Sequence, residues 1–348
     1  MKATATVGEY ALKDSARVLL GTPPRLQLVA DKQAITAGET VTFTTSAGGE
    51  PYTISSWVYR VDSTSQTVAC GTALQCVTPL TTTGTMWVFG AVLDRPDSAS
   101  TPIQVAPLHV RIQPVSGDWN VGPAGTGGTS TLDLEVGVFD ANGQARPNRT
   151  VSLFLASMEG TAGHVHVGGK PTGAVSINPV NTGASGVRIV QYFAPAAAGP
   201  VGITGTSADA QAANGTISVL VGGLQALGAS SYYTLIGDVP DTHTVNHYGF
   251  PAFNTALEEL AERFFQQFGS GLEYNDMSLV LGGVFDLRGD WQSPHGEHKI
   301  GLNLDLRTFT LAEAQLDFVE LVWFELSSVP DADAIHKETT PPHWHLRY

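Results

Sequence analysis

The chain has 348 residues, of which 42% are hydrophobic and 14% charged, and its formal net charge is −14. The acidic balance excludes the basic surface typical of nucleic-acid-binding proteins, and the abundant apolar residues exclude a disordered chain. No apolar run reaches the roughly 18 residues of a membrane-spanning helix, so no transmembrane segment is predicted. The length predicts two or three domains.

Residues 1–23 are an N-terminal segment without the apolar core of a signal peptide. Residues 24–115 alternate apolar and polar positions in short runs, such as RLQLVADKQAITAGETVTFTTSA, MWVFGAVL and PLHVRIQ, which predicts a β-sandwich. The opening ADKQAITAGETVTFT resembles bacterial immunoglobulin-like modules. Cys70 and Cys76 are a close pair between β-like runs, which favours a disulfide and an exported protein over two free thiols.

A linker is predicted over 116–130, which is rich in Gly, Ser and Pro. Residues 131–222 again read as strands and turns and resemble a second immunoglobulin-like sandwich. Within this block, His164 and His166 would share one face of a strand and could bind a metal. No third ligand is visible in the nearby sequence, so this second metal site is not the favoured interpretation.

Residues 223–348 differ in their sequence pattern from the two β blocks. FPAFNTALEELAERFFQQFG (250–269) places apolar residues at steps of three and four, which predicts an amphipathic helix that ends at Gly269. GLNLDLRTF (301–309) predicts a strand, DFVELVWFELSS (317–328) is a second apolar segment, and HWHLRY ends the chain. The sequence therefore predicts an α+β domain after the two all-β sandwiches.

The histidines indicate where chemistry could occur. Seven of the ten lie between residues 243 and 345, including two tight groups, His295 with His298 and His343 with His345. If the chain terminus is a strand, His343 and His345 share a face, and Asp305 lies on the strand predicted before it. Two imidazoles and one carboxylate that leave a fourth position open are typical of catalytic zinc, so we expect His298, Asp305 and His345 to bind Zn²⁺.

These residues also carry a family resemblance. The stretch His295-x-x-His298-x-x-Gly301-x-x-x-Asp305, followed by His343-x-His345, resembles the zinc metallopeptidases of the lysostaphin, D-Ala-D-Ala-peptidase and hedgehog superfamily. In particular, it is similar to penicillin-insensitive murein endopeptidases. The resemblance covers roughly the last 110 residues. It implies a zinc domain of that fold, with His343 beside the activated water and His295 as a further active-site partner.

The resemblance leaves the general base open. Pro342 stands where one branch of the superfamily has a carboxylate, so His343 is the preferred base, with Glu297 and Asp276 in reserve. Asp276 and Ser278, in the segment NDMS, and Glu297 are also candidate substrate-binding residues. NDMS could equally be a turn.

The favoured function is a zinc-dependent peptidase that hydrolyses peptide bonds, in peptidoglycan cross-links or stem peptides or in another peptide substrate. The alternative is a cell-surface binding or adhesion protein that binds metal without turnover. Either function predicts a location outside the cytoplasm: extracellular, at the cell surface or in the periplasm. The sequence does not predict an oligomeric state.

Overall fold

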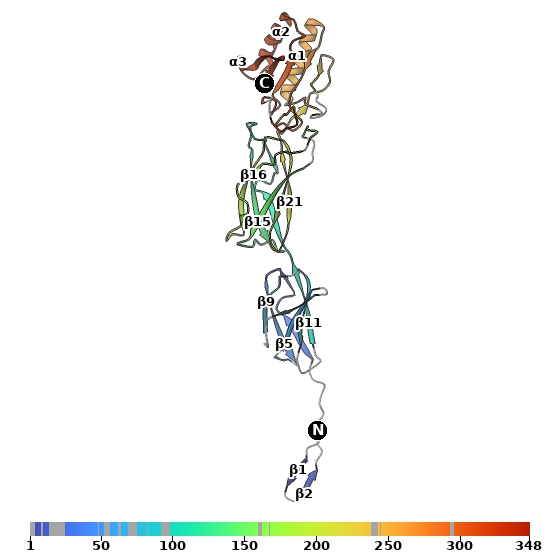
Figure 1. Cartoon of the computed structure of the whole chain (residues 1–348), viewed down its shortest axis with the longest axis vertical. Helices are drawn as coiled ribbons and strands as arrows, with labels where there is room; N and C mark the ends of the chain where they lie inside the picture. The colour runs from blue at the N-terminus through green and yellow to red at the C-terminus, as the bar shows by residue number, and fades with distance from the viewer. Residues whose placement is uncertain are drawn as a thin grey trace. The chain divides into compact units, whose positions relative to one another are not determined.

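The computed structural model describes residues 4–7, 10–13, 25–47, 49–51, 56–61, 64–68, 75–81, 83–91, 98–158, 162–166, 168–237, 243, 245–292 and 296–348. The chain divides into two compact units, Met1–Leu108 and His109–Tyr348. Figure 1 shows the elements of each unit in chain order.

The first unit contains a short hairpin, β1 (Thr4–Val7) with β2 (Tyr10–Lys13), and a β-sandwich. One sheet has the order β4-β11-β10-β7-β8; in the other, β5 pairs with β3, β6 and β9. The strands are β3 (Leu26–Ala30), β4 (Ala34–Thr36), β5 (Thr40–Ala47), β6 (Glu50–Pro51), β7 (Ser56–Val61), β8 (Thr64–Val68), β9 (Gln75–Pro79), β10 (Gly84–Ala91) and β11 (Ser98–Ala106).

Alternation along these strands builds the core of the first sandwich. Val41 and Phe43 of β5 and Met86 of β10 are fully buried and belong to one apolar cluster. The predicted β-sandwich is therefore confirmed. Cys76 is buried in the same cluster, whereas Cys70 lies outside the described residues, so their pairing stays a prediction.

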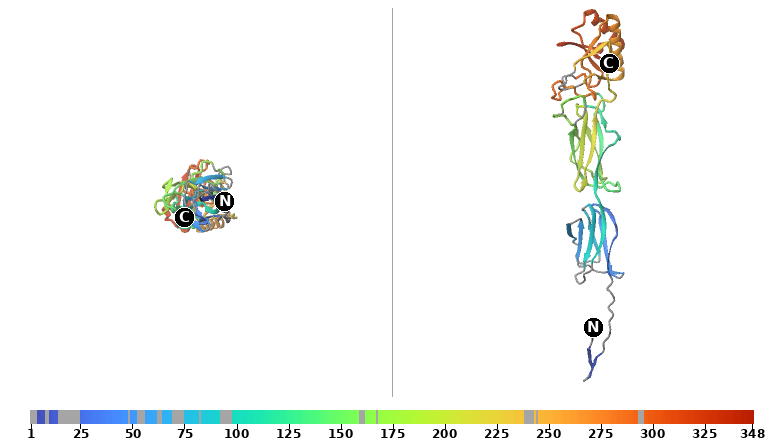
Figure 2. Two further views of the ribbon diagram at one scale, coloured as in Figure 1. Left: turned by 90° about the horizontal axis from the view of Figure 1, so that it is seen from below. Right: turned by 90° about the vertical axis from the view of Figure 1, so that its right-hand side faces the viewer.

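The second unit begins with another sandwich of two five-stranded sheets, ordered β16-β18-β14-β12-β20 and β13-β21-β19-β15-β17. The strands are β12 (Leu108–Pro114), β13 (Asn120–Val121), β14 (Thr131–Phe139), β15 (Thr150–Ser157), β16 (Ala174–Val175), β17 (Val180–Asn181), β18 (Val187–Phe193), β19 (Gly199–Thr206), β20 (Ala210–Gln211) and β21 (Ala213–Val219). Figures 1 and 2 show these strands running alongside one another.

Two expectations about the start of this sandwich are corrected. The strand at 108–114, assigned from sequence to the first block, is β12 and pairs with β14 of the second. The predicted linker 116–130 contributes β13, and Ala124 N–H donates to the Pro195 carbonyl at 2.9 Å, so the segment packs on the sandwich. Gly, Ser and Pro are as frequent in tight turns as in free linkers, and composition alone does not separate the two.

The C-terminal part of the second unit combines helices with a five-stranded sheet of order β23-β25-β26-β28-β27. Its elements are β22 (Gln225–Ala226), β23 (Tyr233–Leu235), β24 (Tyr248–Gly249), α1 (Pro251–Phe268), β25 (Leu272–Tyr274), β26 (Asn303–Arg307), α2 (Glu313–Leu326), α3 (Asp331–Ala334), β27 (Ile335–Thr339) and β28 (Pro342–Arg347). Figures 1 and 2 both show α1 and α2 side by side.

The predicted helix is confirmed as α1. Its apolar stripe faces the core, where Phe253, Leu257, Leu260 and Phe264 are fully buried. Gly269 ends the helix in the left-handed conformation, with φ 66°, and its N–H donates to the Phe265 carbonyl. Glycine adopts this conformation without the steric penalty of a side chain.

No helix in the described part of the chain combines the length and apolar character that crossing a membrane requires.

The packing of α1 gives a test of this core. Leu257→Ala removes a fully buried side chain, whereas Leu321→Ala makes the same change at a helical site that is 61% exposed. We expect Leu257→Ala to lower the free energy of unfolding by about 2–5 kcal/mol and Leu321→Ala to change it by less than about 1 kcal/mol. Urea denaturation of the two variants measures this difference, and equal effects would contradict the packing.

Candidate metal centre

The site is built by two adjacent strands. Side chains alternate between the faces of a strand, so β26 and β28 each present two different surfaces. Leu304 and Leu306 of β26, with Trp344 and Leu346 of β28, belong to the core cluster that also contains the α1 stripe. Asp305, His343 and His345 are therefore directed to the opposite face.

Strand register then brings the polar residues together. Asp305 of β26 lies directly opposite His345 of β28 in the antiparallel pair. Directly opposed residues have neighbouring Cβ atoms, so their side chains interact on the same face. His345 Nδ1 lies 2.7 Å from Asp305 Oδ1.

His298 reaches the same carboxylate from the turn before β26. Gly301, with φ 74°, lets the chain turn between His298 and the strand. A Cβ atom at this position would lie 2.3 Å from Leu224 Cδ2, so the close packing also requires glycine. His298 Nε2 is 3.0 Å from Asp305 Oδ1, and both side chains are almost fully buried.

The three side chains predicted as ligands, His298, Asp305 and His345, thus converge, and their donor atoms lie within 4.8 Å of one another. Such a group could hold a metal ion. Burial favours the neutral form of Asp305, but hydrogen bonds with His298 and His345 outweigh it and hold the pKa of Asp305 well below its usual range. The carboxylate is therefore ionised and available as a ligand.

Glu338 of β27 orients His345. Its Oε1 lies 3.1 Å from His345 Nε2, the ring nitrogen that does not face Asp305. A carboxylate accepts a proton-bearing nitrogen, so this bond places a proton on His345 Nε2. In a neutral ring that binds a metal, Nδ1 would then carry the lone pair. A carboxylate behind a ligating histidine is a common arrangement in metal sites.

His343 lies at the edge of the same site. Its Nδ1 is 2.8 Å from the Pro341 carbonyl, which can only accept, so Nδ1 carries the proton. The Nε2 lone pair then faces the centre, 3.2 Å from His345 Nε2 and 3.7 Å from Asp305 Oδ2. His343 is positioned to accept a proton from a molecule bound beside the three predicted ligands. With Glu338 and His345 it also forms a second, more exposed group that could hold a cation.

A cavity of about 730 Å³ opens onto these residues. Asp276 lines it, and burial, the largest influence, together with the nearby Asp305 raises the pKa of Asp276 to about 7. Glu297 also lines it, but its carboxylate is paired with Arg347, with 2.7 Å between Arg347 Nε and Glu297 Oε2. Burial favours the neutral form of Glu297, but the hydrogen bond and the charge of Arg347 outweigh it and lower the pKa of Glu297. Glu297 is therefore a weak proton acceptor.

Of the remaining candidates, Ser278 lies elsewhere. Ser278 is fully buried, its carbonyl accepts the Tyr248 N–H, and it is not among the residues that line the cavity. His295 lies outside the described residues, so its role stays a prediction.

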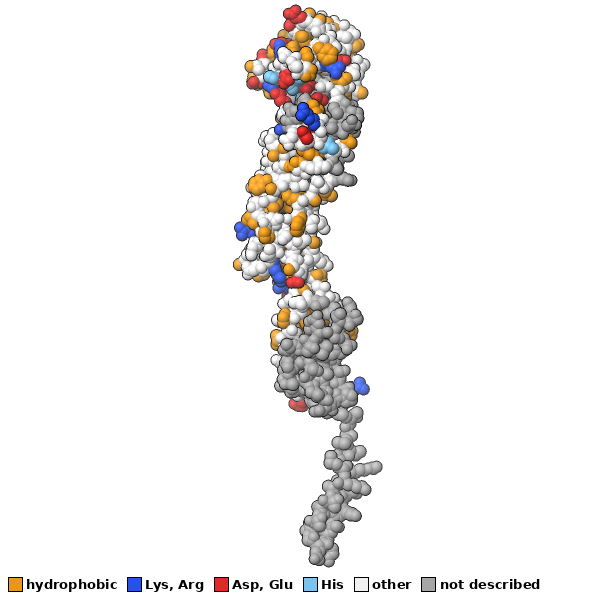
Figure 3. Space-filling view, viewed as in Figure 1, with side chains coloured by type: hydrophobic (Ala, Val, Ile, Leu, Met, Phe, Trp, Pro, Cys, Tyr) orange, Lys and Arg blue, Asp and Glu red, His pale blue; other side chains and the backbone are white. Residues whose placement is uncertain are grey.

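Sequence reasoning missed Glu338. The sequence contained a signal for it. Glu338 lies two residues after His336, and Pro341 and Pro342 separate this pair from the terminal HWHLRY. Recognising β27 and β28 as a hairpin would have placed Glu338 opposite His343, as the register does. In Figure 3, histidine and acidic side chains gather on the C-terminal part of the chain, where this site lies.

Comparison with known proteins identifies no family for this chain. No protein-family model matches it, and no curated protein matches it in sequence. Among solved structures it is similar to the D0-D1 domain of intimin, at 14% identity and a TM-score of 0.25, over 57% of this chain and 98% of that one. It is also similar to the Yersinia pseudotuberculosis adhesin InvE, at 15% identity and a TM-score of 0.31, over 79% and 95%. The Escherichia coli adhesin FdeC matches at 15% identity and a TM-score of 0.26, over 60% and 68%.

Proposed function

We propose that the C-terminal part of the chain is a zinc-dependent peptidase whose metal is held by His298, Asp305 and His345. One observation carries the proposal: three buried donor groups meet on one face of the sheet and border a cavity of about 730 Å³. Two histidines and a carboxylate are a ligand set that zinc uses in catalytic sites, where a fourth position stays open. Glu338 contacts the far nitrogen of His345, which supports an orienting role.

Each residue then has a distinct task. Held by His298, Asp305 and His345, a zinc ion would supply Lewis-acid chemistry for a scissile carbonyl and for water. His343 Nε2 accepts the proton of the attacking water, because its Nδ1 proton is held by the Pro341 carbonyl. Glu338 holds His345 in the tautomer that ligation requires. The substrate proposed is a peptide of the bacterial cell wall, which rests on the sequence resemblance and fits an exported protein.

The direct test is incubation of the full chain with peptidoglycan, with and without a chelator, and mass spectrometry of the released fragments. We expect new peptide ends that disappear with chelator and return with zinc. In His298→Ala and Asp305→Ala, the zinc of this site and peptide release should both be lost, because each variant removes one of three ligands. His109→Ala, in β12, is the control and should keep both. Full activity in a His298→Ala variant that has lost the zinc of this site would contradict the proposal.

A separate prediction concerns His343. His343→Ala should keep the zinc and lower the rate of peptide release by about 10²–10⁴-fold, the usual contribution of general acid–base catalysis. Zinc content by mass spectrometry and release rates on the same preparation measure the two quantities. Loss of zinc in this variant would instead make His343 a ligand.

Glu338 gives a third prediction. Glu338→Gln keeps a hydrogen-bond acceptor for His345 Nε2 but removes the charge, and we expect zinc affinity to fall by about 10–100-fold. Competition with a chelating dye measures it. The control is Glu325→Gln, which changes a carboxylate paired with Arg263 on the surface. Equal affinities in the two variants would exclude the orienting role of Glu338.

A second candidate function is binding or adhesion at the cell surface without turnover. It is supported by the two β-sandwiches, whose described strands run from β3 to β21 and are suited to spacing or contact. The peptidoglycan experiment separates the two candidates. Retention of the zinc-loaded chain on cell walls without any fragment release would favour binding over hydrolysis.

A further inference from the structure

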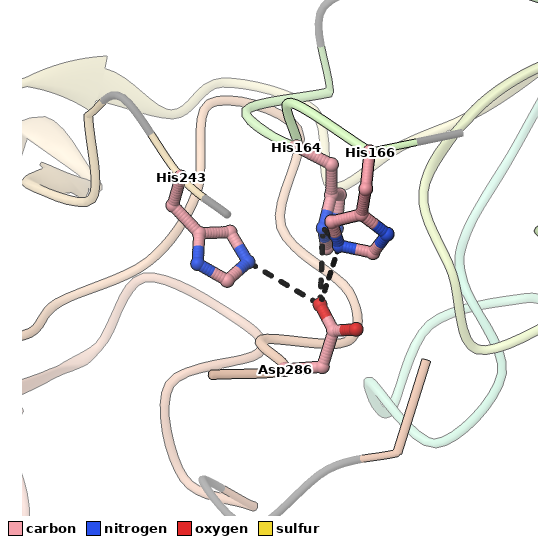
Figure 4. A group of neighbouring side chains, drawn as sticks. All are labelled: His164, His166, His243 and Asp286. Atoms are coloured by element: carbon pink, nitrogen blue, oxygen red, sulfur yellow. Dashed lines mark hydrogen bonds and ion pairs between the residues drawn. The ribbon is translucent and has the colours of Figure 1, made fainter. Parts of the chain in front are cut away.

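A second group of histidines lies where the second sandwich meets the C-terminal sheet domain, within the second unit. His164 and His166 come from the segment between β15 and β16, His243 from that between β23 and β24, and Asp286 from that between β25 and β26. Figure 4 shows the three rings directed at the Asp286 carboxylate. From sequence, His164 and His166 lacked a third ligand and were placed on a strand. They lie instead in a loop, where His164 forms an isolated bridge with His243.

The distances fit one tetrahedral centre. Asp286 Oδ1 lies 3.1 Å from His164 Nδ1, 3.3 Å from His166 Nε2 and 3.3 Å from His243 Nε2. His164 Nδ1 and His166 Nε2 are 3.3 Å apart. Ligands bound tetrahedrally at about 2.0–2.1 Å are about 3.3 Å from one another, so four of the six edges have the length that zinc requires.

Hydrogen bonding alone does not explain this arrangement. A carboxylate oxygen has two lone pairs, yet three imidazole nitrogens surround Asp286 Oδ1. The other oxygen is already used, because Oδ2 accepts the Trp291 N–H at 2.6 Å. Three N–H donors would exceed the capacity of Oδ1, whereas three nitrogen lone pairs and one carboxylate oxygen can share a cation.

The side chains of this group are shielded from solvent. The side chains of His243 and Asp286 are fully buried and that of His164 is 2% exposed. A buried carboxylate is strongly destabilising unless it is paired or coordinates a metal. The ion-pair partners of Asp286 in the described part of the chain are these three histidines, which carry charge only when protonated.

Trp291 packs against two of the histidines. Its ring lies 4.5 Å from the rings of both His164 and His166, and its Nε1 donates to the Gly168 carbonyl at 2.8 Å. Its backbone has φ 59°, which is strained for a bulky residue and is held by the bond to Asp286. Strained backbone of this kind is concentrated at functional and ligand-holding sites.

We propose that His164, His166, His243 and Asp286 form a second, four-coordinate site for a divalent transition-metal ion of the zinc class. All four positions are filled by protein, as in structural rather than catalytic zinc sites. Two ligands come from the sandwich and two from the sheet domain, so the ion fastens these two parts together. This inference does not rest on the proposed peptidase activity.

The test is the zinc content of the full chain and its variants, measured by mass spectrometry after removal of free metal. We expect two zinc ions per chain in the unaltered protein. His166→Ala combined with His243→Ala should leave one, and His298→Ala combined with Asp305→Ala should leave the other. His109→Ala should keep both. A chain that holds one zinc, lost with His298 and Asp305 and unaffected by the His166 and His243 changes, would overturn the second site.

A second measurement distinguishes loss of the metal site from loss of the fold. In the variant lacking His298 and Asp305, cobalt should give the visible absorption of a tetrahedral ion, and chelation should increase hydrogen exchange at residues 162–170 and 284–291. The absence of both responses would overturn the proposal even if zinc content were ambiguous. Because the peptidase ligands are missing here, the outcome is independent of the proposed function.

Discussion

The candidate centre depends on one constraint, the two-residue period of a β-strand. On β26 and β28 this period divides the side chains between an apolar face that packs on the helices and a polar face that holds Asp305, His343 and His345. A shift of either strand by one residue would bury the polar set in the core and expose the leucines. The packing of the leucines in the core that contains α1 therefore fixes the position of the proposed ligands.

Hydrogen bonds from neighbouring segments then set the chemistry of each ring. Glu338 assigns the proton of His345, and the Pro341 carbonyl assigns the proton of His343. Both partners belong to the β27–β28 hairpin, so the same short segment supplies a proposed ligand, its proposed orienting group and the proposed base. The carboxylate of Asp305 is kept ionised by the rings that would share its metal. The site is preorganised by backbone geometry rather than by flexible side chains.

Sequence periodicity predicted the elements whose formation depends on residues that are close together in the chain. The apolar stripe of α1, its end at Gly269 and the strand that holds Asp305 were readable from the sequence, whereas the strand that holds His345 was only assumed. The sheet to which β12 belongs could not be predicted, because the residues of a strand do not specify which strand it pairs with. The group around Asp286 was also hidden, since His166 and Asp286 are separated by 120 positions and only the contact between sandwich and sheet domain joins them.

The proposed catalytic site requires a metal ion between His298, Asp305 and His345. Anomalous diffraction from crystals of the full chain, recorded on both sides of the zinc absorption edge, tests it most directly. We expect an anomalous peak about 2.0–2.2 Å from His298 Nε2, Asp305 Oδ1 and His345 Nδ1, as for zinc bound to nitrogen and oxygen. Zinc-soaked crystals in which these atoms are joined only by hydrogen bonds, with no peak between them, would contradict it.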